Sequence, residues 1–157
     1  MMVMDVAKNG SEFAQLAAVR VLGSFQGAEV SDALLQVYSS AGMPVKFQVV
    51  TSLGERAAAA PLVRILQSEA DLELQETTIV TLGRVPGGRE HLRIFYDRAR
   101  GEMKRPIINS LFAARDEDGL IRIAERERTG LLRRYALERL RLLGTPKAKA
   151  YLEKVKW

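Results

Sequence analysis

A leucine recurs along the chain at nearly constant intervals, and this repeat constrains the fold more than any other feature. The intervals are 31, 29, 29 and 29 residues. Mostly apolar residues stand three, four and eight positions before each leucine, and these offsets fall on one face of an α-helix. The five anchor leucines are Leu22, Leu53, Leu82, Leu111 and Leu140. The pattern predicts five similar helices, here called the anchor helices.

A second apolar stripe follows each anchor leucine and predicts a second helix. Twelve positions after the anchors stand Leu34, Ile65, Ile94, Ile123 and Leu152. The joints should hold the helix-ending residues Gly23, Gly27, Gly54, Gly83, Pro86, Gly87, Gly88, Gly119, Gly144 and Pro146. Pro44, Pro61 and Pro106 fall in expected first helical turns. Eleven positions before the anchors stand the cap positions Ser11, Gly42, Asp71, Arg100 and Thr129, three of which are good N-cap types.

A hairpin of two helices with about 30 residues cannot bury its own apolar face, but several hairpins stacked side by side can. No stretch of the sequence shows the alternation of a β-strand. We therefore expect an all-α protein, an α-solenoid (superhelix) of about five stacked helix-turn-helix repeats. We expect residues 1–157 to form a single such domain.

The segments that carry the repeat resemble a known family of helical repeats. They read "AVRVLG" at 18–23, "VVTSLG" at 49–54, "TIVTLG" at 78–83 and "ALERLRLLG" at 136–144. This sequence pattern resembles that of HEAT-like repeats, in particular the short phycobilisome-lyase type, from about Ser11 to the end of the chain. The chain departs from the family in lacking the Asp-Pro cap and in keeping the paired Arg only at Arg133 and Arg134. The resemblance implies a concave face that binds proteins.

The two ends of the repeat differ. The last helix carries charged residues among its apolar ones, which gives the polar outer face that the end of a solenoid requires. The first anchor helix carries Phe13, Leu16 and Val21 on two sides, and residues 1–10 look too short to give it a complete partner helix. Two expectations follow: self-association through the N-terminal end, or a chain that is a fragment of a longer protein.

Charge is divided unevenly along the chain. Residues 1–83 hold five Lys and Arg against nine Asp and Glu, and residues 84–157 hold nineteen against ten, so the net charges are −4 and +9. The basic half suggests an anionic partner or head-to-tail association, but the favoured interpretation is that helix surfaces need charge and this half uses Arg. The chain has no Cys, which fits a reducing compartment such as the cytoplasm. No apolar run approaches the roughly 20 residues of a membrane span, so we expect no membrane insertion.

The face of the anchor helices opposite the core is the expected binding surface. At 100° per residue it carries offsets −2, −5, −6 and −9 from each anchor leucine. Aromatic groups beside Arg are typical of binding hot spots. The predicted partner-binding residues are Phe47, Gln48, Thr51, Thr77, Asn109, Arg105, Arg134 and Tyr135. The alternative is that Phe47 fills a gap between helices and that Tyr135 is a half-buried packing residue.

Residues with catalytic or ligand-binding chemistry are sparse. The only His, His91, shares its offset with Leu62 and Leu120, which predicts a partly buried helix residue rather than a base. "GRVPGGRE" at 83–90 could hold an anion but lacks the Lys-Ser/Thr of a P-loop, and it reads as a turn. "RDEDG" at 115–119 resembles part of a calcium loop without its later Glu, and Asp118 is expected to cap the next helix. We expect no enzyme activity, no cofactor and no metal.

Three functions remain open. The first is a protein-binding scaffold or adaptor. The second is nucleic-acid binding, because HEAT-like folds include DNA-repair glycosylases that use an Asp and a Trp on a basic concave face. Here the sole Trp is the final residue, Trp157, and the expected face offers no Asp. The third is a lyase subunit acting on a tetrapyrrole, which only the family name implies.

Overall fold

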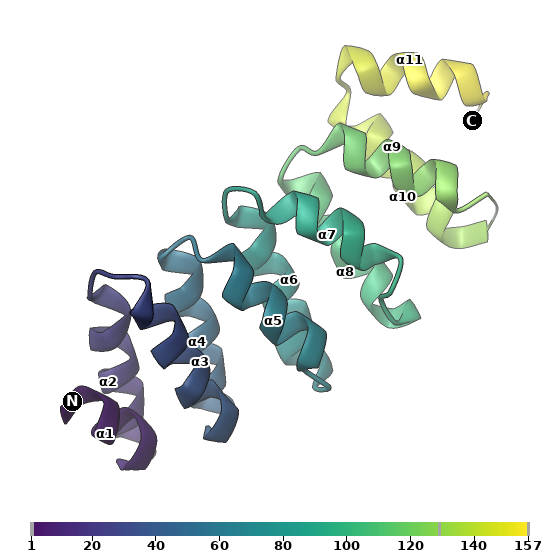
Figure 1. Cartoon of the computed structure of the whole chain (residues 1–157). Helices are drawn as coiled ribbons and strands as arrows, with labels where there is room; N and C mark the ends of the chain where they lie inside the picture. Colours follow the sequence, from purple (N-terminus) through teal and green to yellow (C-terminus); the bar gives the residue numbers. More distant parts are fainter. Residues whose placement is uncertain (1, 129, 157) are drawn as a thin grey trace. The chain divides into compact units, whose positions relative to one another are not determined.

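The computed structural model describes residues 2–128 and 130–156, and these residues form eleven α-helices and no strand (Figure 1). The predicted all-α class is therefore confirmed. Trp157 and the expected cap Thr129 lie outside the described residues. The chain divides into two compact units, Met1–Pro86 (unit 1) and Gly87–Trp157 (unit 2).

Unit 1 arranges its helices in two rows. Its helices are α1 (Met2–Asn9), α2 (Glu12–Ser24), α3 (Glu29–Ser40), α4 (Met43–Glu55), α5 (Ala59–Ser68) and α6 (Leu72–Arg84). The anchor helix α2 packs on α4, and α4 packs on α6. In the second row α1 packs on α3, and α3 packs on α5 (Figure 1). Each helix thus contacts the helix two places further along the chain, which is how repeats stack.

Unit 2 repeats this arrangement. Its helices are α7 (Gly88–Tyr96), α8 (Gly101–Ala113), α9 (Glu117–Arg126), α10 (Gly130–Leu143) and α11 (Pro146–Val155). The anchor helices α8 and α10 pack on each other. The second helices α7 and α9 do the same, as do α9 and α11. Both units are therefore built from the same helical repeat.

The anchor leucines form the centre of each repeat, as the spacing predicts. Each lies in an anchor helix and is at most 1% exposed. The residues three and four positions before each anchor leucine are buried as well. Those that stand three positions before are Val19, Val50, Ile79, Ile108 and Leu137. The helical periodicity of the sequence thus identifies the buried face of all five anchor helices.

The second helix of the third repeat departs from the expected register. Ile94 should be buried by its offset, but it is 57% exposed, and α7 buries Leu92 and Tyr96 instead. Leu92 stands ten positions after its anchor leucine, whereas the corresponding Leu62 in α5 stands nine after. One extra residue turns a helix face by about 100°. The expectation that His91 is partly buried is wrong for the same reason, because His91 is exposed.

The predicted helix starts are confirmed in part. Ser11 and Asp71 are N-caps whose side chains accept hydrogen bonds from the backbone N–H of Ala14 and Leu74. Gly42 and Arg100 occupy the cap positions of α4 and α8 without a side-chain hydrogen bond. The cap of α9 is Asp116, which accepts from the backbone N–H of Gly119, and the expectation of Asp118 is wrong.

One predicted proline position is also wrong. Pro44 and Pro61 lie in the first turns of α4 and α5 as expected, but Pro106 is the sixth residue of α8 and lies inside the helix. Its ring replaces a backbone donor that would have bonded to the preceding turn. Helix α8 nevertheless runs through to Ala113, with its apolar face packed on α9 and α10.

Two glycines expected in joints serve close packing between anchor helices instead. Gly23 and Gly54 lie in the last turns of α2 and α4. A Cβ atom on Gly23 would stand 2.9 Å from the Cβ of Ser52 in α4, and one on Gly54 would stand 2.5 Å from the Cγ2 of Thr81 in α6. Glycine at these positions therefore lets neighbouring anchor helices approach closely.

The N-terminal segment is more regular than the sequence suggests. Residues 2–9 form helix α1, which packs on both α2 and α3. The first anchor helix therefore does have a helical neighbour before it. Phe13 at the start of α2 is nonetheless 84% exposed.

Candidate functional site

The eight predicted partner-binding residues divide equally between the two units, and none of them is buried. Phe47, Gln48 and Thr77 of unit 1 are half-buried and Thr51 is exposed. The residues of unit 2 are described separately below. The helical offsets therefore identify a face turned away from the core, as expected.

In unit 1 the predicted residues bond mainly within their own helices. Gln48 accepts a hydrogen bond from Arg20 Nε at 3.0 Å and donates one to Ser52 Oγ at 3.3 Å. The Thr51 hydroxyl donates to the backbone oxygen of Phe47 at 3.0 Å. Thr51 also lines a shallow pocket of about 290 Å³ between α4 and α6. The predicted residues of unit 1 therefore do not gather around one pocket.

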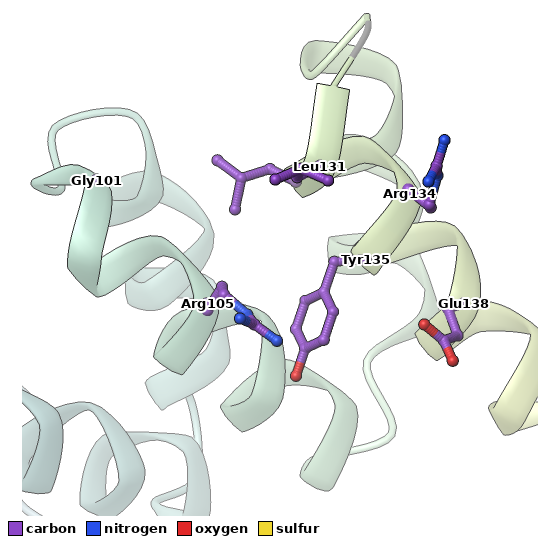
Figure 2. Close-up of a pocket in the computed structure, with 7 residues that line it drawn as sticks. Gly101, Arg105, Leu131, Arg134, Tyr135 and Glu138 are labelled. Atoms are coloured by element: carbon purple, nitrogen blue, oxygen red, sulfur yellow. The ribbon is translucent and has the colours of Figure 1, made fainter.

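In unit 2 three of the predicted residues line one open pocket between α8 and α10, with a volume of about 380 Å³. The three are Arg105 from α8 and Arg134 and Tyr135 from α10. Figure 2 shows Arg105 and Tyr135 facing each other, with Leu131 beside them. In the same view Arg134 and Glu138 lie on the other side of Tyr135 from Arg105. The complete lining is Gly101, Arg105, Leu131, Leu132, Arg134, Tyr135 and Glu138.

Tyr135 is held in place from several directions. Its hydroxyl donates to Asn109 Oδ1 at 2.5 Å and accepts from Arg139 Nη2 at 2.6 Å. The guanidinium carbons of Arg105 and Arg139 lie 4.4 and 4.6 Å from the centre of its ring. Such cation–π contacts are worth about 0.5–1 kcal/mol each at exposed sites. The fourth predicted residue, Asn109, thus belongs to the same cluster through its bond to Tyr135.

The electrostatics of the pocket are cationic. Burial raises the pKa of Tyr135, but hydrogen bonds from Arg139 and Arg105 outweigh it and hold the pKa below the ordinary 10.0. Among the described residues, neither Arg105 nor Arg134 forms an ion pair with a carboxylate. Glu138 is the one carboxylate in the described lining. The pocket therefore offers positive charge that its own walls do not neutralise.

Sequence reasoning missed the apolar part of this pocket. Leu131 is 81% exposed and stands nine positions before the anchor leucine Leu140. That offset belongs to the same helical face as the predicted residues, so the signal was present. Arg139 was missed because its offset of −1 points toward the edge of the core, from which its long side chain reaches Tyr135.

A second cluster of polar side chains occurs once in each unit. Tyr38, Lys46 and Glu69 meet in unit 1, where the Tyr38 hydroxyl bonds to the Glu69 carboxylate and Lys46 Nζ lies 5.0 Å from the ring centre. The counterpart in unit 2 places the Tyr96 hydroxyl 2.9 Å from Glu127 Oε1 and Lys104 Nζ 4.9 Å from the Tyr96 ring centre.

The members of the two clusters are separated by 58 residues in every case, which is twice the repeat length. In each cluster the Lys also approaches the Glu, at 3.9 Å in unit 1 and 3.1 Å in unit 2. Comparing the sequence with itself at a shift of 58 residues would have identified both clusters. Their groups satisfy one another, so we interpret them as structural.

We expect the tyrosines of the folded protein to titrate in a fixed order. Burial, followed by the hydrogen bond to Glu69 or Glu127, raises the pKa of Tyr38 and Tyr96 well above 10.0, whereas the pKa of Tyr135 is lowered. Tyr135 should therefore lose its proton first, and Tyr38 and Tyr96 last. Ultraviolet absorbance of tyrosinate during an alkaline titration measures this order, with Tyr135→Phe and Tyr96→Phe assigning the steps.

The same shifts predict loss of stability at high pH. Below about pH 10 both tyrosines are protonated in the folded and unfolded chain, so their contribution is fully present. Above that pH the unfolded chain releases protons that the folded chain retains, and the free energy of unfolding should fall by about 1.4 kcal/mol per pH unit for each tyrosine. Tyr96→Phe should reduce this slope. Titration of all four tyrosines together in the folded protein would contradict the prediction.

The described residues offer few other kinds of site. In the part of the chain that the structure describes, no group of three His, Asp or Glu side chains is placed to hold a metal ion. Every helix within residues 2–128 and 130–156 is too short or too polar to form a transmembrane span.

Comparison with known proteins gives no relative from which a role could be taken. No family model matches the chain, and neither a curated protein nor a solved structure matches it significantly. The resemblance to HEAT-like repeats therefore stays a prediction. The pocket between α8 and α10 is the candidate site on its geometry alone.

Proposed function

We propose that the chain is a non-catalytic protein-binding module, an α-solenoid of HEAT-like repeats whose anchor-helix face takes up a partner polypeptide. The observation that carries this proposal is the α8–α10 pocket. The pocket is lined by the hydrogen-bonded ring of Tyr135, by Arg105, which has no carboxylate partner among the described residues, and by the exposed Leu131. Aromatic and Arg side chains around an apolar contact are the composition of binding hot spots.

Preorganisation of the pocket also favours binding. Ordering a long side chain at an interface costs about 0.5–1.5 kcal/mol. Here the Arg105 guanidinium already lies against the Tyr135 ring, and the Tyr135 hydroxyl is hydrogen-bonded to Asn109 and Arg139. A partner that contacts this cluster loses less free energy to ordering than it would on a mobile surface.

Site-specific photo-cross-linking in cell extract tests the proposed face. A photoreactive amino acid at Glu138, an exposed residue of the pocket lining, should link to a distinct polypeptide, and Tyr135→Ala in the same chain should abolish that link. The matched control places the same group at Ile94, which is also exposed but lies on α7, a second helix of the repeat. Equal cross-linking from both positions, or none from Glu138, would contradict binding at this face.

Nucleic-acid binding is the second candidate, and the charge of unit 2 favours it. Residues 87–157 hold eighteen Lys and Arg against ten Asp and Glu, a net charge of +8. Fluorescence polarisation with a labelled DNA duplex across a salt series tests it. Salt-sensitive binding that is lost in the Arg105→Glu, Arg134→Glu double variant would favour nucleic acid. Binding that neither salt nor these changes affect would not.

A further inference from the structure

We propose that the α8–α10 pocket recognises a residue pair on a partner polypeptide, an apolar side chain next to a carboxylate. The carboxylate pairs with Arg105, and the apolar side chain packs on Leu131 and Tyr135. This inference rests on the proposed function and adds the chemistry of the ligand to it.

The case for a carboxylate begins with Arg105. Arg105 is an exposed residue and has no carboxylate partner among the described residues, and its guanidinium carbon lies 4.4 Å from the centre of the Tyr135 ring. The contact with the ring holds the guanidinium at the wall of the pocket, where it can donate further hydrogen bonds. A planar fork held in this way suits a carboxylate, which can accept two parallel hydrogen bonds.

The case for an apolar neighbour comes from the opposite wall. Leu131 is 81% exposed although it lies within a helix, and Leu132 beside it is half-buried. Both line the pocket together with the Tyr135 ring. An apolar side chain that covers such a surface gains roughly 25 cal/mol per Å² removed from water. A volume of about 380 Å³ accommodates one large side chain and its neighbour.

The same walls argue against a nucleic-acid backbone as the ligand of this pocket. A phosphodiester would pair with Arg105 equally well, but it would leave the Leu131 surface unused. Glu138 in the lining would also repel a run of phosphates, whereas a single carboxylate can sit beside Arg105 on the other side of Tyr135 from Glu138 (Figure 2). The combination of one open cation with an exposed leucine is what a mixed apolar and acidic peptide fits.

Nuclear magnetic resonance with two short probes tests the inference directly. The probes are the capped tetrapeptide acetyl-Gly-Leu-Asp-Gly-amide and its Asn counterpart, which has the same shape without the charge. We expect the Asp peptide to shift the Leu131 methyl and Arg105 Nε–H signals in a saturable way at millimolar concentration. We expect the Asn peptide to bind ~5-fold more weakly, as the loss of one exposed ion pair implies.

Variants separate the pocket from general attraction to a basic surface. Arg105→Gln should weaken the Asp peptide ~5-fold and leave the Asn peptide unchanged, and Leu131→Ala should weaken both. The matched control is Arg141→Gln, which removes the same charge from an exposed position of α10 outside the pocket. Circular dichroism checks that each variant stays folded.

The outcomes decide between the possibilities. Equal affinity for the two peptides, no saturable shift at Leu131, or an equal effect of Arg141→Gln would overturn the inference. A DNA duplex that displaces the Asp peptide and is sensitive to Arg105→Gln but not to Leu131→Ala would overturn it in favour of nucleic acid. If the cross-link from Glu138 persists while the peptides fail, the protein-binding function stands and only this ligand chemistry is wrong.

Discussion

Replacing Asp116 with alanine is expected to lower the free energy of unfolding by about 3 kcal/mol, as the loss of one partner of a buried ion pair does. Asp116 is 3% exposed and caps α9 through the backbone N–H of Gly119 at 3.3 Å. Its carboxylate also accepts from Arg93 Nε at 2.7 Å and from Nη2 of the same guanidinium. The hydrogen bond to Asp116 raises the pKa of Arg93. A guanidinium also stays charged without that bond, so the variant would leave Arg93 charged and without its buried carboxylate partner. Urea unfolding followed by circular dichroism measures the loss.

The neighbouring Asp118 supplies the matched control. It is exposed, and its carboxylate pairs with Lys147 at the surface. Asp118→Ala should therefore cost much less than Asp116→Ala, because exposed ion pairs contribute little. Asp116→Asn should lie between the two, since an amide oxygen still caps a helix but does not balance Arg93. A larger loss from Asp118→Ala would show that the cap of α9 is assigned to the wrong residue.

Asp116 also illustrates why some local details could not be predicted from the sequence. Two aspartates stand two positions apart at the start of α9, and either residue type caps helices well. The choice depends on Arg93, a residue of α7 that reaches Asp116 only once α7 and α9 pack together. A Cβ on Gly119 would stand 2.2 Å from Asp116 Oδ2, so the glycine leaves room for this arrangement.

The helical class and the buried face of the anchor helices could be predicted because one residue pattern determines both. Leu53 and Leu111 recur at the repeat length with apolar residues at helical offsets, and burial of that face is the main stabilising term. Ile94 is a position where prediction from fixed offsets fails. Fixed offsets assume joints of constant length, and the joint before α7 shifts the buried face of that helix by one residue.

The candidate site could be predicted as a set of residue positions but not as a cluster. Helical offsets place Arg105, Asn109 and Tyr135 on one face because that requires only the backbone. Their meeting at one ring depends on the spacing of α8 and α10 and on side-chain conformations, which periodicity does not determine. In unit 1, Thr51 has the offset of Asn109, and Thr77 has the offset of Tyr135. The Thr51 hydroxyl and the Thr77 backbone oxygen nevertheless form hydrogen bonds within their own helices.

The pocket depends on the packing of α10, and this leads to the second large effect. Replacing Leu140 with alanine should lower the free energy of unfolding by about 3 kcal/mol, within the range for buried leucines that leave a cavity. Leu140 is fully buried, whereas Leu142, two residues further along the same helix, is 50% exposed. Leu142→Ala makes the identical chemical change and should cost less than about 1 kcal/mol, because about half of its surface stays in water in the folded chain and its removal leaves no enclosed cavity.

Comparing these two variants tests the repeat itself, since the 29-residue spacing assigns the core position to Leu140 and not to Leu142. Urea midpoints for both, measured with the unchanged chain, give the comparison. Because Leu142 stands seven residues beyond Tyr135 along α10 and does not line the pocket, folded Leu142→Ala should keep the tyrosine titration of the unchanged chain. Leu140→Ala should lose the low pKa of Tyr135 at urea concentrations that leave the control folded. Similar costs for the two leucines would mean that α10 packs on a face other than the one its periodicity predicts, and the pocket beside it would then have no fixed wall.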